Sequence, residues 1–566
     1  MPQRKKLHLG DSDFKSVIEN DYYYIDKSLF IQDILESEKA VMLLPRPRRF
    51  GKTLNLSMLK YFFDIREPQN KDLFTGLNIW QAEDEIKEKQ GSYPVIYISF
   101  KDAKADNWEE CYELIVYEIA NLYNHHRYIL ESDILYEEEK TKFKNILNET
   151  AKKVDYQRSL NQLSEFLIRY HHQKAIILVD EYDTPIQAGY KFFYREVISF
   201  MRNLLSGAYK DNIYLYKGAI TGILRVSKES IFSGLNNLSV YSILQTRFSD
   251  KFGFTENEVQ QIVKDFQIEA DYEKIKQWYN GYQIGKTSNI YNPWAVLNFA
   301  AEHEEGFKAY WVNTSSDELI KEQLLQKDAR EIREEFLKLI NNESINKNIE
   351  ENFVFPELKR RKDLIWTLLT YSGYLTIIKK ISFFEYELRI PNYEIKIIFK
   401  RTILEWFQSD INIRLITLQE TTNHLVNNRI DEFEQGFKQI IGDTFSYYDA
   451  TENHEYVYHS YMLGLLAIIG DDYIIRSNRE SGEGRYDIVL LPRDKQKNGV
   501  VIEIKQIPKQ GKDEPDEKFT ERINMSIKKA AEQIDRHKYY KELLDYGLRA
   551  EQIVKAPVVF AGKEPY

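Results

Sequence analysis

The sequence predicts an α/β protein with a parallel sheet in its N-terminal half and a smaller α/β domain at its C-terminal end. Three observations support this prediction. Short apolar runs alternate with segments of helical periodicity, a phosphate-binding type of loop follows the first run, and two apolar runs near the C-terminus form a predicted hairpin. The strand-like runs are residues 40–44, 93–100, 175–180 and 212–221, and helical periodicity is clearest at 108–123 and 159–171.

The chain has 566 residues, which at roughly 100–200 residues per domain predicts several domains. We expect a parallel-sheet domain over residues 1–250 and a helical extension over 251–360. A linker domain over 361–450, winged-helix-like in one interpretation, contains an alternating hairpin at 374–391. A last α/β domain is expected over 451–566, with strands at 486–491 and 499–505 and a helix at about 522–544.

The composition narrows the cellular compartment in which the protein is expected and the kinds of partner it can bind. The 78 Lys and Arg against 88 Asp and Glu give a net charge of −10, so binding to nucleic acid would need a local basic patch or metal ions. The single cysteine, Cys111, cannot form an internal disulfide. Apolar runs are far shorter than the ~20 residues that cross a bilayer. We expect a cytoplasmic protein that has no membrane partner.

Residues 46–53, Arg-Pro-Arg-Arg-Phe-Gly-Lys-Thr, lie between the first strand-like run and a helical segment. A nucleotide's phosphates need backbone N–H groups at a helix start, a lysine and a hydroxyl for Mg²⁺. Gly51, Lys52 and Thr53 fill these roles. Arg46 stands where the usual loop has its first glycine, and a chance turn before a helix is the alternative. We count Arg46 and Arg49 with the predicted nucleotide-binding residues.

The strand at 175–180 ends in two acids, which predicts a partner for this loop at the same sheet edge. Asp180 would hold Mg²⁺ through water, and Glu181 would polarise the attacking water. Thr221 ends the next strand, where it could sense the γ-phosphate, and Arg225 follows on the loop. A solvated strand end and a structural threonine are the alternatives.

The C-terminal hairpin carries a second candidate site. A period of two puts Glu503 and Lys505 on one face of their strand. If the hairpin brings Asp487 beside Glu503, the two carboxylates can bind Mg²⁺ or Mn²⁺, while Lys505 orients a water for phosphodiester hydrolysis. An edge strand with a solvated Glu/Lys face is the alternative.

Two upstream residues, Glu455 and His459, share a helix face at spacing i, i+4. Glu455 either completes the metal site or caps its helix, and His459 is interpreted as a partly buried histidine. Lys528 and Lys529 lie on the following helix and could track a phosphate backbone.

These motifs resemble a bacterial and archaeal family that joins an AAA-ATPase-like domain to a C-terminal nuclease-like domain of the PD-(D/E)XK superfamily. The matching blocks are residues 24–28, 46–53, 179–183, 252–255, 278–282, 291–294, 455–459, 477–482, 484–487, 503–505 and 533–534. In this family Arg46 belongs to the variant loop. The resemblance implies a P-loop NTPase sheet with ATP as its ligand, and a metal-dependent nuclease fold behind it.

Three functions agree with these residues. The first is an ATP-binding, ATP-hydrolysing protein whose Mg²⁺-dependent nuclease domain acts on nucleic acid, DNA rather than RNA, under nucleotide control. The second is an ATP-dependent switch whose nuclease-like domain is a non-catalytic binding or assembly module. The third is an ATPase without a nucleic-acid partner, which the acidic net charge favours. A homo-oligomer, including a ring, stays open.

Overall fold

The computed structural model describes residues 6–225, 237–311, 330–352, 355–401 and 415–444, and residues 462–566 apart from 463–464, 467–468, 471, 478–479, 482–483, 486, 512 and 563. The chain forms two compact units, one of residues 1–312 and 346–394 and one of residues 313–345 and 395–566. The second unit takes residues 313–345 from the region expected as the helical extension and residues 395–450 from the region expected as the linker domain.

The first unit is built on a parallel sheet of five strands in the order β2-β3-β4-β1-β5. The strands are β1 (Val41–Pro45), β2 (Val95–Ser99), β3 (Ala175–Asp180), β4 (Leu215–Gly222) and β5 (Leu238–Val240). The predicted parallel α/β sheet is confirmed, and β5 is an addition to the predicted strands. Because β4 lies between β1 and β3, the ends of these three strands meet at one sheet edge.

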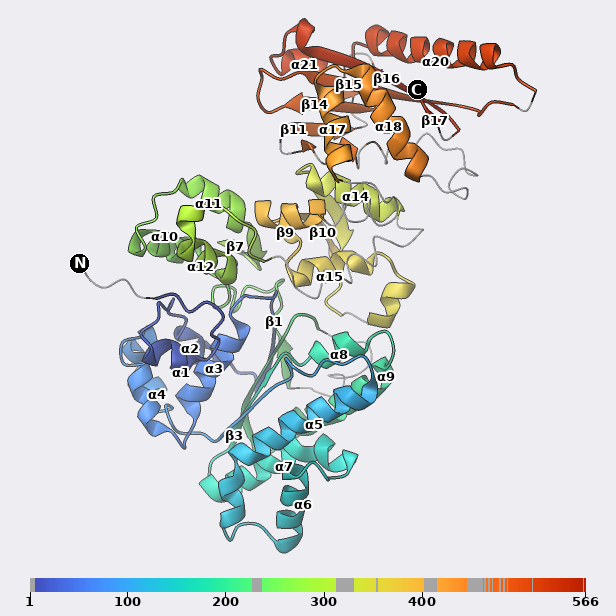
Figure 1. The fold of residues 1–566 in the computed structure, drawn as a ribbon. Helices are drawn as coiled ribbons and strands as arrows, with labels where there is room; N and C mark the ends of the chain where they lie inside the picture. The colour runs from blue at the N-terminus through green and yellow to red at the C-terminus, as the bar shows by residue number, and fades with distance from the viewer. Residues whose placement is uncertain are drawn as a thin grey trace. The chain divides into compact units, whose positions relative to one another are not determined.

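Helices cover both faces of this sheet (Figure 1). One face carries α1 (Phe14–Glu19), α2 (Leu29–Leu35) and α3 (Lys52–Phe63), and the other carries α5 (Trp108–His125), α7 (Lys153–His171) and α9 (Tyr194–Tyr209). Three further helices, α4 (Asp84–Lys87), α6 (Glu137–Leu147) and α8 (Thr184–Gly189), lie in the connections. Of these, α6 is within the charged segment before α7.

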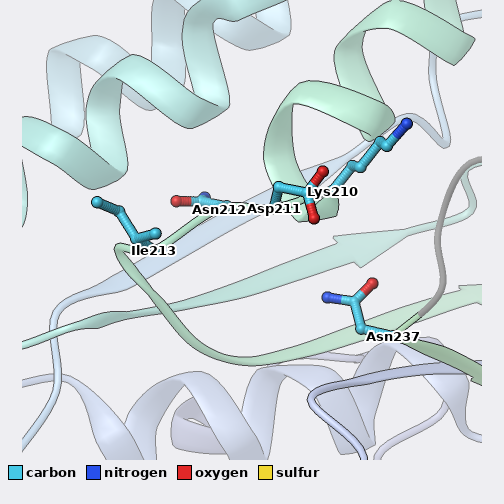
Figure 2. A pocket seen from close by; sticks show the side chains of 5 residues that line it. All are labelled: Lys210, Asp211, Asn212, Ile213 and Asn237. Atoms are coloured by element: carbon cyan, nitrogen blue, oxygen red, sulfur yellow. The ribbon is translucent and has the colours of Figure 1, made fainter.

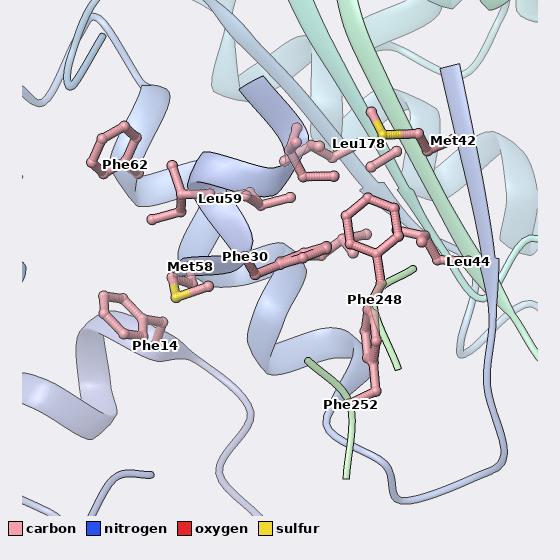
Figure 3. Close-up of a cluster of buried hydrophobic side chains, with 14 of the residues drawn as sticks. Phe14, Phe30, Met42, Leu44, Met58, Leu59, Phe62, Leu178, Phe248 and Phe252 are labelled. Carbon is pink, nitrogen blue, oxygen red and sulfur yellow. The ribbon is translucent and has the colours of Figure 1, made fainter. Parts of the chain in front are cut away.

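The core beneath α3 follows the alternation of the strands. Met42, Leu44 and Leu178 point from β1 and β3 toward Leu59 and other apolar side chains of α3, and all are buried (Figure 3). Burial of this apolar surface fixes α3 on the sheet, and with α3 it fixes the loop that precedes the helix.

A helical part follows the sheet, as the sequence predicts. It contains α10 (Glu256–Asp265), α11 (Tyr272–Tyr279) and α12 (Pro293–Ala301) around a separate apolar cluster. The hairpin of β6 (Tyr282–Ile284) and β7 (Thr287–Ile290) instead buries Tyr282, Ile284 and Ile290 in the core beneath α3. A three-stranded sheet in the order β8-β10-β9 comprises β8 (Ile345–Asn348), β9 (Thr376–Lys380) and β10 (Glu385–Arg389). The predicted hairpin at 374–391 is therefore present, and the helix before it, α15 (Leu364–Ser372), is buried at every residue.

The second unit contains a mixed sheet in the order β11-β14-β15-β16-β17. Its strands are β11 (Tyr473–Ser477), β14 (Ile488–Pro492), β15 (Gly499–Ile507), β16 (Ile553–Ala561) and β17 (Glu564–Pro565), and β12 (Glu480–Ser481) pairs with β13 (Gly484–Arg485) nearby. The helices are α14 (Arg330–Ile340), α17 (Leu415–Val426), α18 (Ile430–Thr444), α20 (Asp516–Arg536) and α21 (Lys541–Asp545). The predicted C-terminal α/β domain is confirmed, with α20 lying against β15 and β16. Among the residues that the structure describes, no helix is both long and apolar enough to cross a membrane.

Candidate functional site

The loop between β1 and α3 ends at Gly51, which starts the helix in a left-handed conformation with φ 79°. A β-carbon at Gly51 would meet nothing within 4 Å, so the requirement for glycine comes from the backbone angle and from the open space in front of the helix. Glycine has no side chain that could cap the first turn. An anion in front of this turn would therefore find donor N–H groups.

Lys52 lies beneath this loop. Its ammonium donates to the carbonyl oxygens of Pro47 at 2.9 Å and Arg46 at 3.2 Å, and only 6% of the residue is exposed. Burial lowers the pKa of Lys52, and the carboxylates of Glu181 and Asp180 oppose this effect. The ammonium is thus held close to the predicted phosphate position and electrostatically coupled to both acids.

Asp180 is the point at which three elements converge. Its Oδ1 accepts from the Thr221 hydroxyl at 2.5 Å and its Oδ2 accepts from the Thr53 hydroxyl at 2.8 Å, while the carboxylate is fully buried. Burial raises the pKa of Asp180, and the two hydroxyl donors oppose the rise. A hydroxyl beside a carboxylate is the ligand pair that holds Mg²⁺ in phosphate-loop enzymes, so these residues can bind the metal of a metal–nucleotide complex.

Glu181 adopts a left-handed backbone conformation with φ 48°, which is uncommon for a residue other than glycine and occurs at functional sites. Its Oε2 accepts from the Thr184 hydroxyl at 3.1 Å. The side chain is half-buried and follows Asp180 directly, so it can reach a water at the carboxyl edge of the sheet.

Asp183 is a structural part of this edge to which the sequence analysis gave no role. The carboxylate is 1% exposed and its Oδ2 accepts from the backbone N–H groups of Ile223 at 2.9 Å and Leu224 at 3.0 Å. A β-carbon at Gly222 would lie 2.5 Å from Asp183 Oδ1. Asp183 therefore ties the acids after β3 to the loop after β4. Asp183 also accepts from the side chain of Gln187 at 2.9 Å. An acid three residues after Asp180 was visible in the sequence, but two of its donors are backbone groups forty residues away.

The structure gives Arg46 a different position from the one expected of a phosphate ligand. Its guanidinium is fully buried and donates to the carbonyl oxygens of Pro45, Tyr241 and Phe248, and it lies 5.0 Å from the ring centroid of Phe252. Burial lowers the pKa of Arg46 to about 9. Arg46 thus connects the loop to the segment after β5, and three carbonyl dipoles replace the water that the cation lost.

The other two predicted arginines lie apart from Asp180. The exposed Arg49 guanidinium stacks 4.2 Å from the ring of Trp294 on α12, and Arg225 forms an ion pair with Glu351 at 3.7 Å. Their predicted contacts with a nucleotide are therefore not part of the cluster around Asp180.

A hollow of about 340 Å³ lies elsewhere on the sheet, lined by Lys210, Asp211, Asn212, Ile213 and Asn237 (Figure 2). These residues precede β4 and β5, so the hollow is at the amino-terminal edge of the strands. Ligands of parallel α/β sheets bind at the carboxyl edge, so this hollow is separate from the candidate nucleotide site.

The C-terminal candidate site is formed by strands β14 and β15. They are antiparallel, with Ile488 opposite Ile502, and the same register extended by one residue puts Asp487 opposite Glu503. The Asp487 carboxylate accepts from the Ile504 N–H at 2.7 Å. The two carboxylates therefore belong to neighbouring positions at one end of the hairpin, where opposed side chains are close.

Glu503 and Lys505 share one strand face, as predicted. Lys505 donates to Glu503 Oε1 at 2.7 Å, and Glu503 is 2% exposed. Val501 lies two residues before Glu503 and so shares its strand face, and Val489 is opposite Val501 on β14. Both valines belong to an apolar cluster with Ile534 of α20. The acids and the lysine thus lie on the sheet face that α20 covers.

The third predicted metal ligand, Glu455, lies outside the described residues, as does His459. Within the described ranges, no group of three or more His, Cys, Asp or Glu side chains could hold a metal ion. Asp487 and Glu503 are a two-carboxylate arrangement that a metal would complete with waters, with phosphate oxygens or with a further side chain.

Two parts of the chain match known protein families. Residues 8–232 match the model of a family described as "Predicted AAA-ATPase", and residues 453–565 match the PD-(D/E)XK nuclease superfamily. A curated relative from Azotobacter chroococcum mcd 1, named as an uncharacterized protein in the vnfD 5' region, is 28% identical over an alignment of 403 residues that covers 69% of each chain. The comparison with solved structures finds a Walker-type ATPase of Pyrococcus abyssi, which aligns with 71% of this chain and 99% of its own chain at 12% identity and a TM-score of 0.35.

The class of protein is thus a predicted ATPase with an appended nuclease-superfamily domain. Specifically, residues 8–232 are an AAA-ATPase-like domain and residues 453–565 are a domain of the PD-(D/E)XK nuclease superfamily, which confirms the family resemblance of the motifs.

Proposed function

We propose that this chain binds and hydrolyses ATP in its first unit, and that its C-terminal domain cleaves nucleic acid under the control of the bound nucleotide. The observation that carries the first half is the buried Asp180 carboxylate, which accepts hydrogen bonds from Thr53 and Thr221. The second half is supported by the register of β14 and β15, which puts Asp487 opposite Glu503.

In the nucleotide site, each residue has a separate task. Lys52 exchanges its carbonyl partners for phosphate oxygens, and Gly51 lets the triphosphate approach the first turn of α3. Thr53 and Asp180 would hold Mg²⁺, which would supply positive charge against the phosphates. Glu181 accepts a proton from the attacking water, and Thr221 keeps Asp180 oriented. Arg46 acts from within the core by fixing the loop.

In the C-terminal site, Asp487 and Glu503 would hold Mg²⁺ or Mn²⁺. When bound, the metal lowers the pKa of a water and neutralises charge on the phosphate. Lys505 donates to Glu503 Oε1 and can orient the attacking water. DNA is the proposed polymer, and the family match to a nuclease superfamily supports nucleic acid as the partner.

The test uses the full chain with plasmid, linear duplex and single-stranded DNA, and with RNA, in Mg²⁺ or Mn²⁺, with and without ATP. Glu503→Gln should abolish cleavage while ATP turnover continues, and Lys52→Ala should abolish turnover and the effect of ATP on cleavage. Matched controls are the exposed Glu551→Gln and Lys71→Ala, which should behave as the parent protein does.

The same assay decides between the alternatives. ATP turnover with nucleic-acid binding but no cleavage under any condition would favour a switch whose nuclease-like domain is a binding module. Turnover with neither binding nor cleavage would favour an ATPase without a nucleic-acid partner, and an absence of ATP binding would contradict the proposal outright.

A further inference from the structure

The turn between β9 and β10 exposes a cluster of large apolar side chains. Phe383 is 76% exposed, Phe384 60% and Ile381 43%. Nowhere else in the described part of the chain do three exposed large apolar residues fall within four consecutive positions. Single exposed apolar residues are ordinary, whereas a cluster indicates an interaction surface.

The cluster is held on a rigid support. The N–H groups of Ile381 and Ser382 both donate to the carbonyl of Glu385, at 2.9 and 3.1 Å, which closes the turn. The Phe384 carbonyl accepts from the N–H of Ile349 at 2.9 Å. Ile377 and Leu388 are buried in the flanking strands. A partner that binds these aromatic rings would therefore pay little conformational entropy for ordering the turn.

Cations accompany the aromatic rings. Lys379 and Lys380 directly precede the turn and are exposed. The Lys380 ammonium lies 5.4 Å from the ring centroid of Phe383, and the rings of Phe383 and Phe384 are edge-to-face at 4.6 Å. In the register of the hairpin Lys379 is opposite Glu387, whereas Lys380 is opposite Tyr386. Lys380 is thus the cation that lies with the exposed aromatic rings.

We propose that residues 379–384, the hairpin tip, bind a single strand of nucleic acid. The exposed rings of Phe383 and Phe384 would stack on unpaired bases, and Lys379 and Lys380 would contact the neighbouring phosphates. Aromatic rings next to cations are the recurrent chemistry of single-strand binding, because every base has a π-face and every nucleotide a charge. In a duplex the base faces are covered, so an unpaired strand is the fitting ligand. This inference rests on the proposed action on nucleic acid.

The experiment measures binding of the full chain to a 5′-fluorescein-labelled 30-nucleotide oligo(dT) and to a labelled duplex, by anisotropy with EDTA present so that no strand is cleaved. Phe383→Ala with Phe384→Ala should weaken single-strand binding about 30-fold or more, since each of the two stacked bases contributes roughly 1–3 kcal/mol. Lys379→Ala with Lys380→Ala should make the plot of log K against log salt concentration less steep by about 1.4, because each of the two lost phosphate contacts contributes about 0.7 to the slope.

Phe192→Ala is the matched control, because Phe192 is 78% exposed in the same unit but lies outside the hairpin. Equal affinity of the double phenylalanine variant and the parent, or no single-strand binding by the parent, would overturn the inference. Two other results for the double phenylalanine variant would also overturn it. The variant could keep strand binding but lose binding to anionic phosphatidylserine vesicles, or keep strand binding but lose self-association in sedimentation. A parent that binds the strand through the tip but never cleaves in Mg²⁺ or Mn²⁺ would refute only the nuclease proposal.

Discussion

Thr53 and Asp180 are 127 positions apart in the sequence, yet the Thr53 hydroxyl donates to Asp180 Oδ2 at 2.8 Å. The contact joins the start of α3 to the end of β3, so the phosphate loop and the acids form one site. Thr221 completes the contact from β4, which lies between β3, where Asp180 ends the strand, and β1, the strand that precedes the loop to Thr53.

The Thr53–Asp180 pair predicts a metal-dependent defect. Thr53→Val keeps the shape of the side chain but removes the hydroxyl that would bind Mg²⁺. We expect the affinity for ATP with Mg²⁺ to fall about tenfold and the affinity for ATP in EDTA to change little, as measured by calorimetry. The lost hydrogen bond should lower the free energy of unfolding by about 1 kcal/mol. An equal loss of affinity with and without Mg²⁺ would contradict a role in metal binding.

Replacing Glu181 should slow ATP hydrolysis without weakening ATP binding. Glu181→Gln removes the proton acceptor while keeping the hydrogen-bonding shape, so ATP should bind as before and hydrolysis should slow by about 100-fold or more. Steady-state phosphate release and nucleotide titration measure the two effects, with the exposed Glu304→Gln as control. Undiminished turnover would remove Glu181 from the mechanism.

Arg46 and Arg49 should differ in what they stabilise. Arg46→Met leaves three buried carbonyl oxygens without their donor, and we expect the free energy of unfolding to fall by about 3 kcal/mol. Arg49→Met removes only an exposed stack on Trp294, which is worth about 0.5–1 kcal/mol. Urea unfolding followed by tryptophan fluorescence tests this contrast. Similar stabilities of the two variants would show that the burial of Arg46 is not what fixes the loop.

Glu394 predicts a pH dependence of stability. Its carboxylate is 1% exposed and its Oε1 accepts from the N–H groups of Tyr310 and Trp311. Burial raises the pKa of Glu394 to about 7 from the ordinary 4.5. The folded chain therefore binds this proton more tightly than the unfolded chain does, so the stabilisation is complete below pH 4.5 and is lost as the pH rises through 7.

Glu394→Gln removes this titration while its amide oxygen can still accept from both N–H groups. Between pH 5 and pH 8 the free energy of unfolding of the variant should rise by about 3 kcal/mol relative to that of the parent. This value follows from the pKa shift of Glu394, since each pKa unit corresponds to about 1.4 kcal/mol. Urea unfolding at several pH values, with Glu304→Gln as reference, measures it. Parallel pH profiles of Glu394→Gln and the parent would refute the buried titration.

The C-terminal metal site can be tested without any cleavage assay. Asp487→Asn keeps an oxygen that accepts from the Ile504 N–H, so the hairpin should persist, but the pair with Glu503 loses a charge. Mn²⁺ should raise the unfolding temperature of the parent and not that of the variant, because a ligand that binds only the folded state stabilises it. The exposed Asp545→Asn serves as control. An equal shift in the parent and Asp487→Asn would place the metal elsewhere.

Much of the fold was predictable because its signals are local. The four predicted strands, the loop at residues 46–53 and the hairpin of β14 and β15 depend on alternation, helical period and glycine positions within short windows. β5 was missed since three half-buried residues produce no clear period. The burial of Arg46 was missed because its carbonyl partners come from residues 241 and 248, and backbone acceptors leave no mark in a sequence.

By itself the sequence determined which groups this protein can use: a lysine and threonine at a helix start, acids at strand ends, and two acids with a lysine on a hairpin. Only the tertiary structure decided that Thr221 reaches Asp180, that Asp183 holds the loop after β4, and that Asp487 is opposite Glu503. Strand order and register cause this difference, because both are set by burial of distant apolar faces against one another and not by the residues that carry the chemistry.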